Sequence, residues 1–235
     1  MKSKTKNSIL KYIAKNNIKC NVAENTLQKI GMKKKFILIE GTDGSGKDTF
    51  ASILVDKLKE RFLYDENATL SIVGQPLSKC KRGEEALSFI EDKKNNYSKD
   101  VVGQILTENR IDTEKYFNKL GGITICIRGL LTDLATYYHV FGEEAASNLG
   151  QTIMIDKLII VDVDSKIADN RITERGLPRT WREYFEYLVY FRDYYLKYES
   201  QLYREKIVIE NIDLNQLDIT TEGIANSLFI SCLEE

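Results

Sequence analysis

A glycine-rich segment that ends in a lysine carries the clearest chemistry in the sequence. It reads GTDGSGKDT, starts at Gly41 and lies between an apolar run and a segment of helical periodicity. Glycines let backbone amides converge on a phosphate chain, and the amino end of a helix adds partial positive charge. Lys47 can reach the outer phosphates and follow negative charge as it develops in transfer. The segment predicts a loop that binds a nucleoside triphosphate through Gly41, Gly44, Ser45, Gly46, Lys47, Asp48 and Thr49.

The residue after the lysine departs from the usual phosphate loop. Serine or threonine is expected there as a magnesium ligand, whereas this chain has Asp48 followed by Thr49. A carboxylate on the first helical turn is favourable, but beside phosphates it repels unless a cation lies between them. Two interpretations are open: Asp48 binds Mg²⁺ directly or through water, or Asp48 points away and Thr49 lines the loop. We favour metal involvement and assign Asp48 and Thr49 to a Mg²⁺ site.

Arginines gather at two further places in the sequence. Arg128 ends an apolar run, which is where ligands bind in open α/β sheets. Arg171 and Arg175 lie four residues apart and so share one helical face, and Arg179 and Arg182 follow closely. Phosphoryl transfer needs positioning and charge neutralisation more than covalent chemistry. We therefore expect Arg128 to lie at the ligand-binding edge of the sheet, and the later arginines to form a lid.

Apolar runs and helical patterns alternate along the chain and must position these residues. Strands are expected at residues 35–40, 68–73, 122–127, 157–163 and 206–209. Helices are expected at residues 48–62, 81–92, 101–120, 130–141, 165–174, 181–204 and 222–233. Strands that are apolar throughout and separated by helices indicate a parallel sheet covered on both faces. The predicted fold class is α/β: a P-loop NTPase with a five-stranded parallel sheet flanked by helices, and an arginine-bearing lid.

Charge divides the chain into two parts. The 235 residues have a net charge of -1, but residues 1–31 hold seven lysines and one acid, which leaves -7 for residues 32–235. We expect residues 1–31 to be a basic N-terminal extension with the pattern of a short amphipathic helix. An acidic main domain argues against a nucleic-acid partner. No apolar run approaches the roughly 18 residues that a membrane span needs.

The cysteines and the single histidine exclude further chemistry. The four cysteines are far apart, with no C-x-x-C pair, which argues against a structural zinc site and fits a reducing, cytoplasmic compartment. One histidine, His139, excludes any mechanism that needs a histidine cluster. We expect His139 to be a packed ring.

From residue 32 onward the chain resembles the thymidylate kinases, within the P-loop nucleoside-monophosphate kinases. The segments that carry the resemblance follow the family's order: IEGTDGSGKDT, Gln75-Pro76, Leu106–Arg110, Ile127-Arg128-Gly129, and Arg171–Gly176 in the lid. The resemblance implies that residues 32–235 form a P-loop nucleotide kinase domain. It further implies transfer of the ATP γ-phosphate to dTMP with Mg²⁺, and a homodimer.

The resemblance also implies roles for single residues. Asp43 matches a loop acid near the acceptor's sugar, Arg110 matches an arginine that reads the base, and Arg128 matches the arginine that grips the acceptor phosphate. The implied acceptor-binding set is Asp43, Pro76, Arg110, Arg128, Thr132 and Tyr137. The implied catalytic set is Lys47, Arg128, Arg171 and Arg175, the last two covering the transferring phosphoryl group.

Three changes near the acceptor depart from the family pattern. Ile127 replaces the acid that ends the third strand, Leu106 replaces the aromatic that stacks on thymine, and Leu77 and Ser78 stand where an arginine is expected. These changes motivate two alternatives to a dTMP kinase. One is a related P-loop kinase acting on a modified pyrimidine nucleotide or a nucleic-acid base. The other is a nucleotide-binding protein with weak catalysis.

Overall fold

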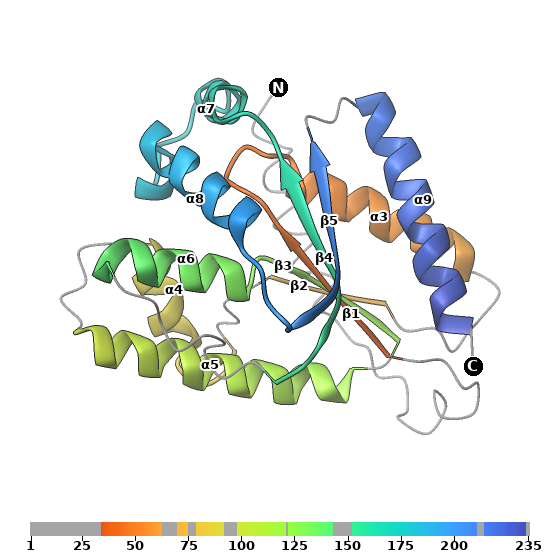
Figure 1. Cartoon of the computed structure of the whole chain (residues 1–235), viewed down its shortest axis with the longest axis horizontal. Helices are drawn as coiled ribbons and strands as arrows, with labels where there is room; N and C mark the ends of the chain where they lie inside the picture. Colours follow the sequence, from red (N-terminus) through yellow and green to blue (C-terminus); the bar gives the residue numbers. More distant parts are fainter. Residues whose placement is uncertain are drawn as a thin grey trace.

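The computed structural model describes most of the chain from residue 34 onward (Figure 1). The described residues are 34–62, 70–74, 79–91, 98–120, 122–142, 152–210 and 214–233. The predicted extension at residues 1–31 and the predicted site residue Pro76 lie outside them. No helix among the described residues is long and apolar enough to cross a membrane.

A parallel sheet of five strands forms the centre of the described structure. The strands are β1 (Lys35–Glu40), β2 (Leu70–Gly74), β3 (Ile123–Ile127), β4 (Ile155–Asp162) and β5 (Tyr203–Glu210). Their order is β2-β3-β1-β4-β5, and all neighbours pair in parallel. The chain adds β2 and β3 on one side of β1, and then β4 and β5 on the other side. The loop after β1 therefore lies at the switch point of the sheet, where such folds bind ligands.

Helices cover both faces of this sheet (Figure 1). On one face α3 (Lys47–Phe62) packs against α9 (Leu214–Leu233). On the other face lie α4 (Gly83–Glu91), α5 (Lys99–Lys119), α6 (Leu130–Phe141) and α8 (Phe185–Lys197). The short helices α7 (Ser165–Glu174) and η1 (Trp181–Glu183) follow β4 at the carboxyl edge. The predicted sheet with helices on both faces is confirmed.

The two cores follow from the alternation of side chains along β1. Phe36 and Leu38 point into the core under α5 and α6, whereas Ile37 and Ile39 point into the core under α3 and α9. Both sets are buried, because helices lie on both faces of the strand. A central parallel strand is buried on both faces and therefore needs a continuous apolar run, not an alternation of apolar and polar residues.

The predicted helix over residues 181–204 is wrong at both ends. The chain forms η1, turns at Tyr184, which is the N-cap of α8, and ends α8 at Lys197. β5 then begins at Tyr203, three residues before the predicted strand, because Tyr203 pairs with Ile155 of β4. The tyrosines continue the helical spacing past the real end of α8, so the pattern alone hides the boundary.

We expect a core substitution in α3 to destabilise the protein more than an exposed one in α9. Leu54 is completely buried between the sheet and α9, whereas Ile219 is 75% exposed. Leu54→Ala leaves a cavity and should lower the free energy of unfolding by about 2–5 kcal/mol. Ile219→Ala should change it by less than about 0.5 kcal/mol. Urea unfolding measures both; equal losses would contradict the placement of α3 against the sheet.

Candidate active site

The predicted phosphate loop joins the end of β1 to the start of α3. Gly44 and Gly46 have φ angles of +79° and +92°, which other residues rarely adopt. A Cβ on Gly44 would lie 2.5 Å from the carbonyl oxygen of Ala168 in α7, so the loop packs directly on that helix. The Ser45 hydroxyl is turned inward and accepts a hydrogen bond from the backbone amide of Lys47 at 3.3 Å. The strand, loop and helix expected from the sequence are present in that order.

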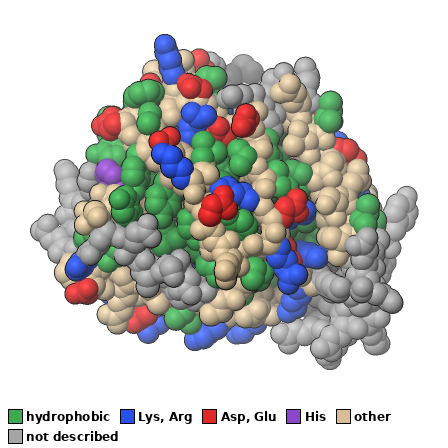
Figure 2. Space-filling model, viewed as in Figure 1, with side chains coloured by type: hydrophobic (Ala, Val, Ile, Leu, Met, Phe, Trp, Pro, Cys, Tyr) green, Lys and Arg blue, Asp and Glu red, His purple; other side chains and the backbone are tan. Residues whose placement is uncertain are grey.

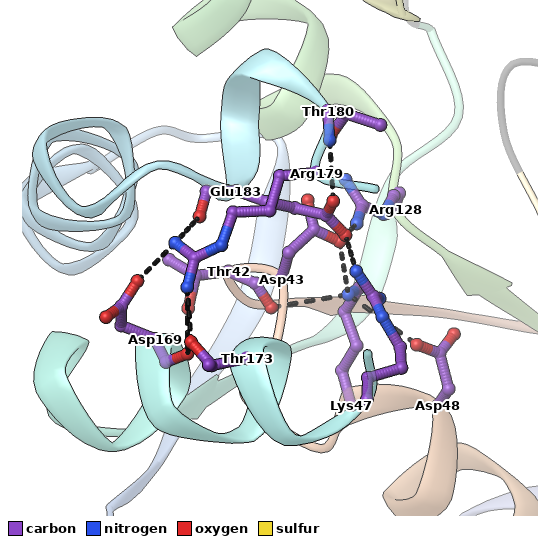
Figure 3. Close-up of polar contacts among 11 residues, drawn as sticks. Thr42, Asp43, Lys47, Asp48, Arg128, Asp169, Thr173, Arg179, Thr180 and Glu183 are labelled. Atoms are coloured by element: carbon purple, nitrogen blue, oxygen red, sulfur yellow. Dashed lines mark hydrogen bonds and ion pairs between the residues drawn. The ribbon is translucent and has the colours of Figure 1, made fainter. Parts of the chain in front are cut away.

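Lys47 is buried at the base of the loop, with only 2% of its surface exposed. Its Nζ donates to the Thr42 carbonyl at 3.3 Å and lies 3.8 Å from Asp43 and 3.6 Å from Asp48 (Figure 3). Burial lowers the pKa of Lys47, and the nearby carboxylates of Asp48 and Asp43 oppose this effect. The ammonium is therefore held in place by protein oxygens at a site where phosphate oxygens would offer stronger partners.

Asp48 and Thr49 lie on the first turn of α3, and both are exposed. The Asp48 carboxylate turns toward Lys47 (Figure 3). Among the described residues, no three His, Cys, Asp or Glu side chains gather in a way that could hold a metal. Mg²⁺ is usually bound by one or two protein oxygens together with substrate phosphates and water. The donors present at Asp48 and Thr49 fit that mode of binding.

Arg128 faces the loop from the end of β3. Its guanidinium forms an ion pair with Asp43 (Figure 3). Its amide donates to the Ile39 carbonyl at 2.9 Å. Burial favours a neutral Asp43, but Arg128 and Lys47 outweigh it and hold the pKa of that carboxyl well below its usual range. The φ angle of Arg128 is +64°, a strained conformation for a residue with a side chain. Such strain is frequent at functional sites.

A buried polar network supports the same end of the sheet. Glu40 has no exposed surface and accepts two hydrogen bonds from Thr132, from Oγ1 at 2.7 Å and from the amide at 3.3 Å. The Thr132 hydroxyl also lies 3.1 Å from the hydroxyl of Tyr195. Burial raises the pKa of Glu40, and the bonds from Thr132 partly oppose this. The network fixes the first turn of α6 to the strand that precedes the phosphate loop.

The predicted base-reading side chains lie between α5 and α6. Arg110 is buried and forms an ion pair with the equally buried Asp133. Tyr137 packs on the α5 backbone, and its hydroxyl donates to the Lys99 carbonyl at 3.3 Å. The structure therefore brings Arg110 and Thr132 to neighbouring helices, with Asp133 as a partner that the sequence did not reveal.

The lid arginines divide into two kinds. Arg171 reaches the phosphate loop, where its Nη1 donates to the Gly44 and Ser45 carbonyls at 3.2 and 3.3 Å. Arg175 instead donates to Glu183 of η1 at 2.5 Å. Arg179 binds Asp169 and Thr173 of α7 and so ties the segment together (Figure 3). Of these three arginines, Arg171 is thus the one that hydrogen-bonds to the phosphate loop in this structure.

Sequence reasoning did not assign Glu40, Tyr195 or Arg182 to the site. Glu40 carries a usable signal, because a charged residue that ends an apolar strand needs a buried partner. Tyr195 is hidden among the many tyrosines of α8. Arg182 was expected only as one of the lid arginines, with no role of its own, yet it lines a pocket with Asp43 and Arg128.

The parallel sheet, the loop over Lys47 and the arginines around it define a P-loop nucleotide kinase. The family model for thymidylate kinase matches residues 39–222. The chain belongs to the thymidylate kinase family.

Individual proteins agree with this assignment. A probable thymidylate kinase of Pyrobaculum aerophilum is 29% identical over 168 residues, which cover 68% of this chain and 81% of the relative. One from Methanococcus vannielii is 26% identical over 148 residues, covering 60% and 67%. The solved thymidylate kinase of Candida albicans has a TM-score of 0.58 at 17% identity, covering 83% of this chain and 92% of its own. That of Ehrlichia chaffeensis has a TM-score of 0.53 at 19% identity, covering 82% and 98%.

We expect Gly44→Ala to impair nucleotide binding. The new Cβ would collide with the Ala168 backbone, and the φ angle of +79° would become strained. The loop must then move away from α7, so ATP affinity should fall by about tenfold or more, the scale of a 1–3 kcal/mol backbone strain. Calorimetric titration with ATP measures this.

Gly223→Ala is the matched control for that substitution. Gly223 lies in α9, and nothing lies within 4 Å of a Cβ built there. This alanine should leave ATP affinity unchanged and stabilise the helix by about 0.5–1 kcal/mol. Equal ATP affinity in the two variants would show that the contact between the loop and α7 does not shape the nucleotide site.

Proposed function

We propose that this protein transfers the γ-phosphate of ATP to dTMP, producing ADP and dTDP. The observation that carries the proposal is the buried Lys47 ammonium beneath the phosphate loop, with the ion pair of Arg128 and Asp43 beside it. The family model and the probable thymidylate kinases of the two archaea support dTMP as the acceptor.

The donor side is formed by the loop and the lid. Backbone amides at the start of α3 suit phosphate oxygens, and Lys47 would follow the γ-phosphoryl group as its charge develops. Mg²⁺, when bound at Asp48 and Thr49, supplies charge neutralisation between the phosphates. Arg171, already against the loop carbonyls, would turn toward the transferring group, and Arg175 would join it on leaving Glu183.

The acceptor side is formed by β3, α5 and α6. Arg128 would grip the dTMP phosphate while Asp43 stays close to the sugar. Arg110 and Thr132 would face the base and sugar from α5 and α6, and Tyr137 would line the same pocket. Pro76, which follows β2 in the sequence, completes the proposed acceptor set. The Glu40 network holds Thr132, which leaves α6 little freedom at its first turn.

The family resemblance also supports a homodimer, with nucleotides as the small-molecule partners.

The face drawn in Figure 2 mixes charged side chains of both signs with hydrophobic ones. Such a face offers nucleic acid no continuous basic surface there. Together with the charge of residues 32–235, this supports free nucleotides over DNA as substrates.

We expect Lys47→Ala to abolish most turnover. Removing a charge that follows the phosphoryl group costs transition-state stabilisation, so kcat should fall by about 100-fold or more. Lys59→Ala is the matched control, because Lys59 lies on the same helix with its side chain 49% exposed. A coupled assay for ADP measures both variants; near-normal kcat for Lys47→Ala would refute the mechanism.

We expect Asp48→Ala to change metal-dependent and metal-free binding in opposite directions. Without Asp48 the affinity for Mg²⁺-ATP should fall by about tenfold, as for lost metal-site partners. Without Mg²⁺, ATP should bind the variant at least as tightly as the wild type, because a repelling carboxylate is gone. Titrations with and without Mg²⁺ measure this, with Asp56→Ala, exposed on the same helix, as control. Equal losses in both conditions would rule out metal contact by Asp48.

A further inference from the structure

Arg182 lines a narrow pocket between the phosphate loop and α8. One wall consists of Thr42 and Asp43 of the phosphate loop and of Arg128, which follows β3. The opposite wall is apolar and consists of Leu188, Phe191 and Tyr195. The pocket thus joins the end of β3 to the segment that follows the lid.

Two guanidinium groups face one carboxylate among the described residues that line this pocket. The charge of Arg182 helps Arg128 and Lys47 to lower the pKa of Asp43, and it also lowers that of Lys47. The charges of Arg182, Arg128, Lys47 and Asp43 are therefore close enough to affect one another. The charge of Arg182 also lowers the pKa of Asp133, so it acts on two carboxylates, and an anion in the pocket would give both guanidinium groups a further partner. A phosphate monoester dianion has the charge and the planar oxygen pairs that two arginines bind well.

The backbone on both sides of Arg182 is fixed. Glu183 accepts from the Thr180 amide at 2.7 Å and from Arg175 at 2.5 Å, which closes the turn of η1. Trp181 packs against Tyr187 at 5.1 Å and His139 at 5.7 Å between ring centroids. Arg182 stands between these anchors, so its guanidinium is presented to the pocket from a rigid turn.

The position of the pocket distinguishes donor from acceptor. The donor phosphates belong at the amino end of α3, where Arg171 meets the loop carbonyls. Arg182 instead lines the pocket with Arg128, which follows β3, and with Tyr195 of α8, whose pKa its charge lowers. The pocket has a volume of about 10 Å³, which holds no more than one water. A phosphate can therefore enter only after the side chain of Arg182 moves outward.

We infer that Arg182 binds the phosphate of the acceptor nucleotide, opposite Arg128, and closes over it from the η1 turn. The inference rests on the proposed function. It assigns a binding role to a residue outside the phosphate loop and beyond the lid helix α7. Arg182 would give the acceptor site a second cation, although Leu77 and Ser78 stand at the sequence position where the family pattern has an arginine.

Comparison of dTMP with thymidine tests the inference, because the two differ only by the phosphate. Arg182→Gln should weaken dTMP binding by about 10- to 100-fold, the range for a hydrogen bond to a charged group. Thymidine binding and the KM for ATP should stay within about twofold of wild type. Arg182→Lys keeps the charge but not the planar fork, so its dTMP affinity should lie between that of the wild type and that of Arg182→Gln. Arg204→Gln is the control of equal charge change, with its side chain 72% exposed at the amino edge of the sheet.

Three results would overturn the inference. Equal loss of dTMP and thymidine binding would mean that Arg182 only shapes the pocket. Loss of ATP affinity with dTMP binding intact would place it on the donor side. A wild type that binds dTMP no more tightly than thymidine would leave no phosphate contact to explain. If Arg182→Gln does not fold, Arg182→Lys decides the question by the same comparison.

Failure of the proposed function is a separate observation. A wild type that binds dTMP in preference to thymidine but releases no ADP from ATP would disprove the proposed reaction. In that case the loss of this preference in Arg182→Gln would still support the phosphate contact.

Discussion

The burial of the Lys47 ammonium is the constraint on which the rest of the site depends. A charge with 2% exposure is costly unless oxygen atoms surround it, and here they come from the Thr42 carbonyl, Asp43 and Asp48. Asp43 in turn needs Arg128, whose strained backbone is fixed by the Ile39 carbonyl. The loop, the end of β3 and the start of α3 are thereby positioned as one unit.

The order of the strands explains why these groups meet at one edge. β1 lies between β3 and β4, so the loop after β1 faces the residues that follow both neighbours. Arg128 follows β3, and α7 with Arg171 follows β4. The buried network of Glu40 and Thr132 then sets the direction of α6, on which the acceptor side depends. Because helices cover both faces of the sheet, a ligand can approach the strands at this carboxyl edge.

Sequence patterns predicted the parts of the molecule whose signal is local. The apolar strands, the glycine spacing and Lys47 are each read from a few adjacent residues, and the structure has them within about three residues of where they were expected. The end of α8 was missed because Tyr198 and Tyr203 continue a helical spacing that pairing with β4 overrides. The partners of buried charges were missed because they are distant in the sequence. Asp133 lies 23 residues from Arg110, and Thr132 lies 92 residues from Glu40.

The departures at Leu106, at Ile127 and at Leu77 with Ser78 make the acceptor the central question about this member of the family. The most direct measurement is ADP release from ATP and Mg²⁺ against a panel of dNMPs, NMPs, nucleosides and short DNA. We predict that dTMP gives the highest kcat/KM and that nucleosides and DNA give no ADP release. Turnover with DNA alone, or ATP binding without ADP release for every acceptor, would contradict it.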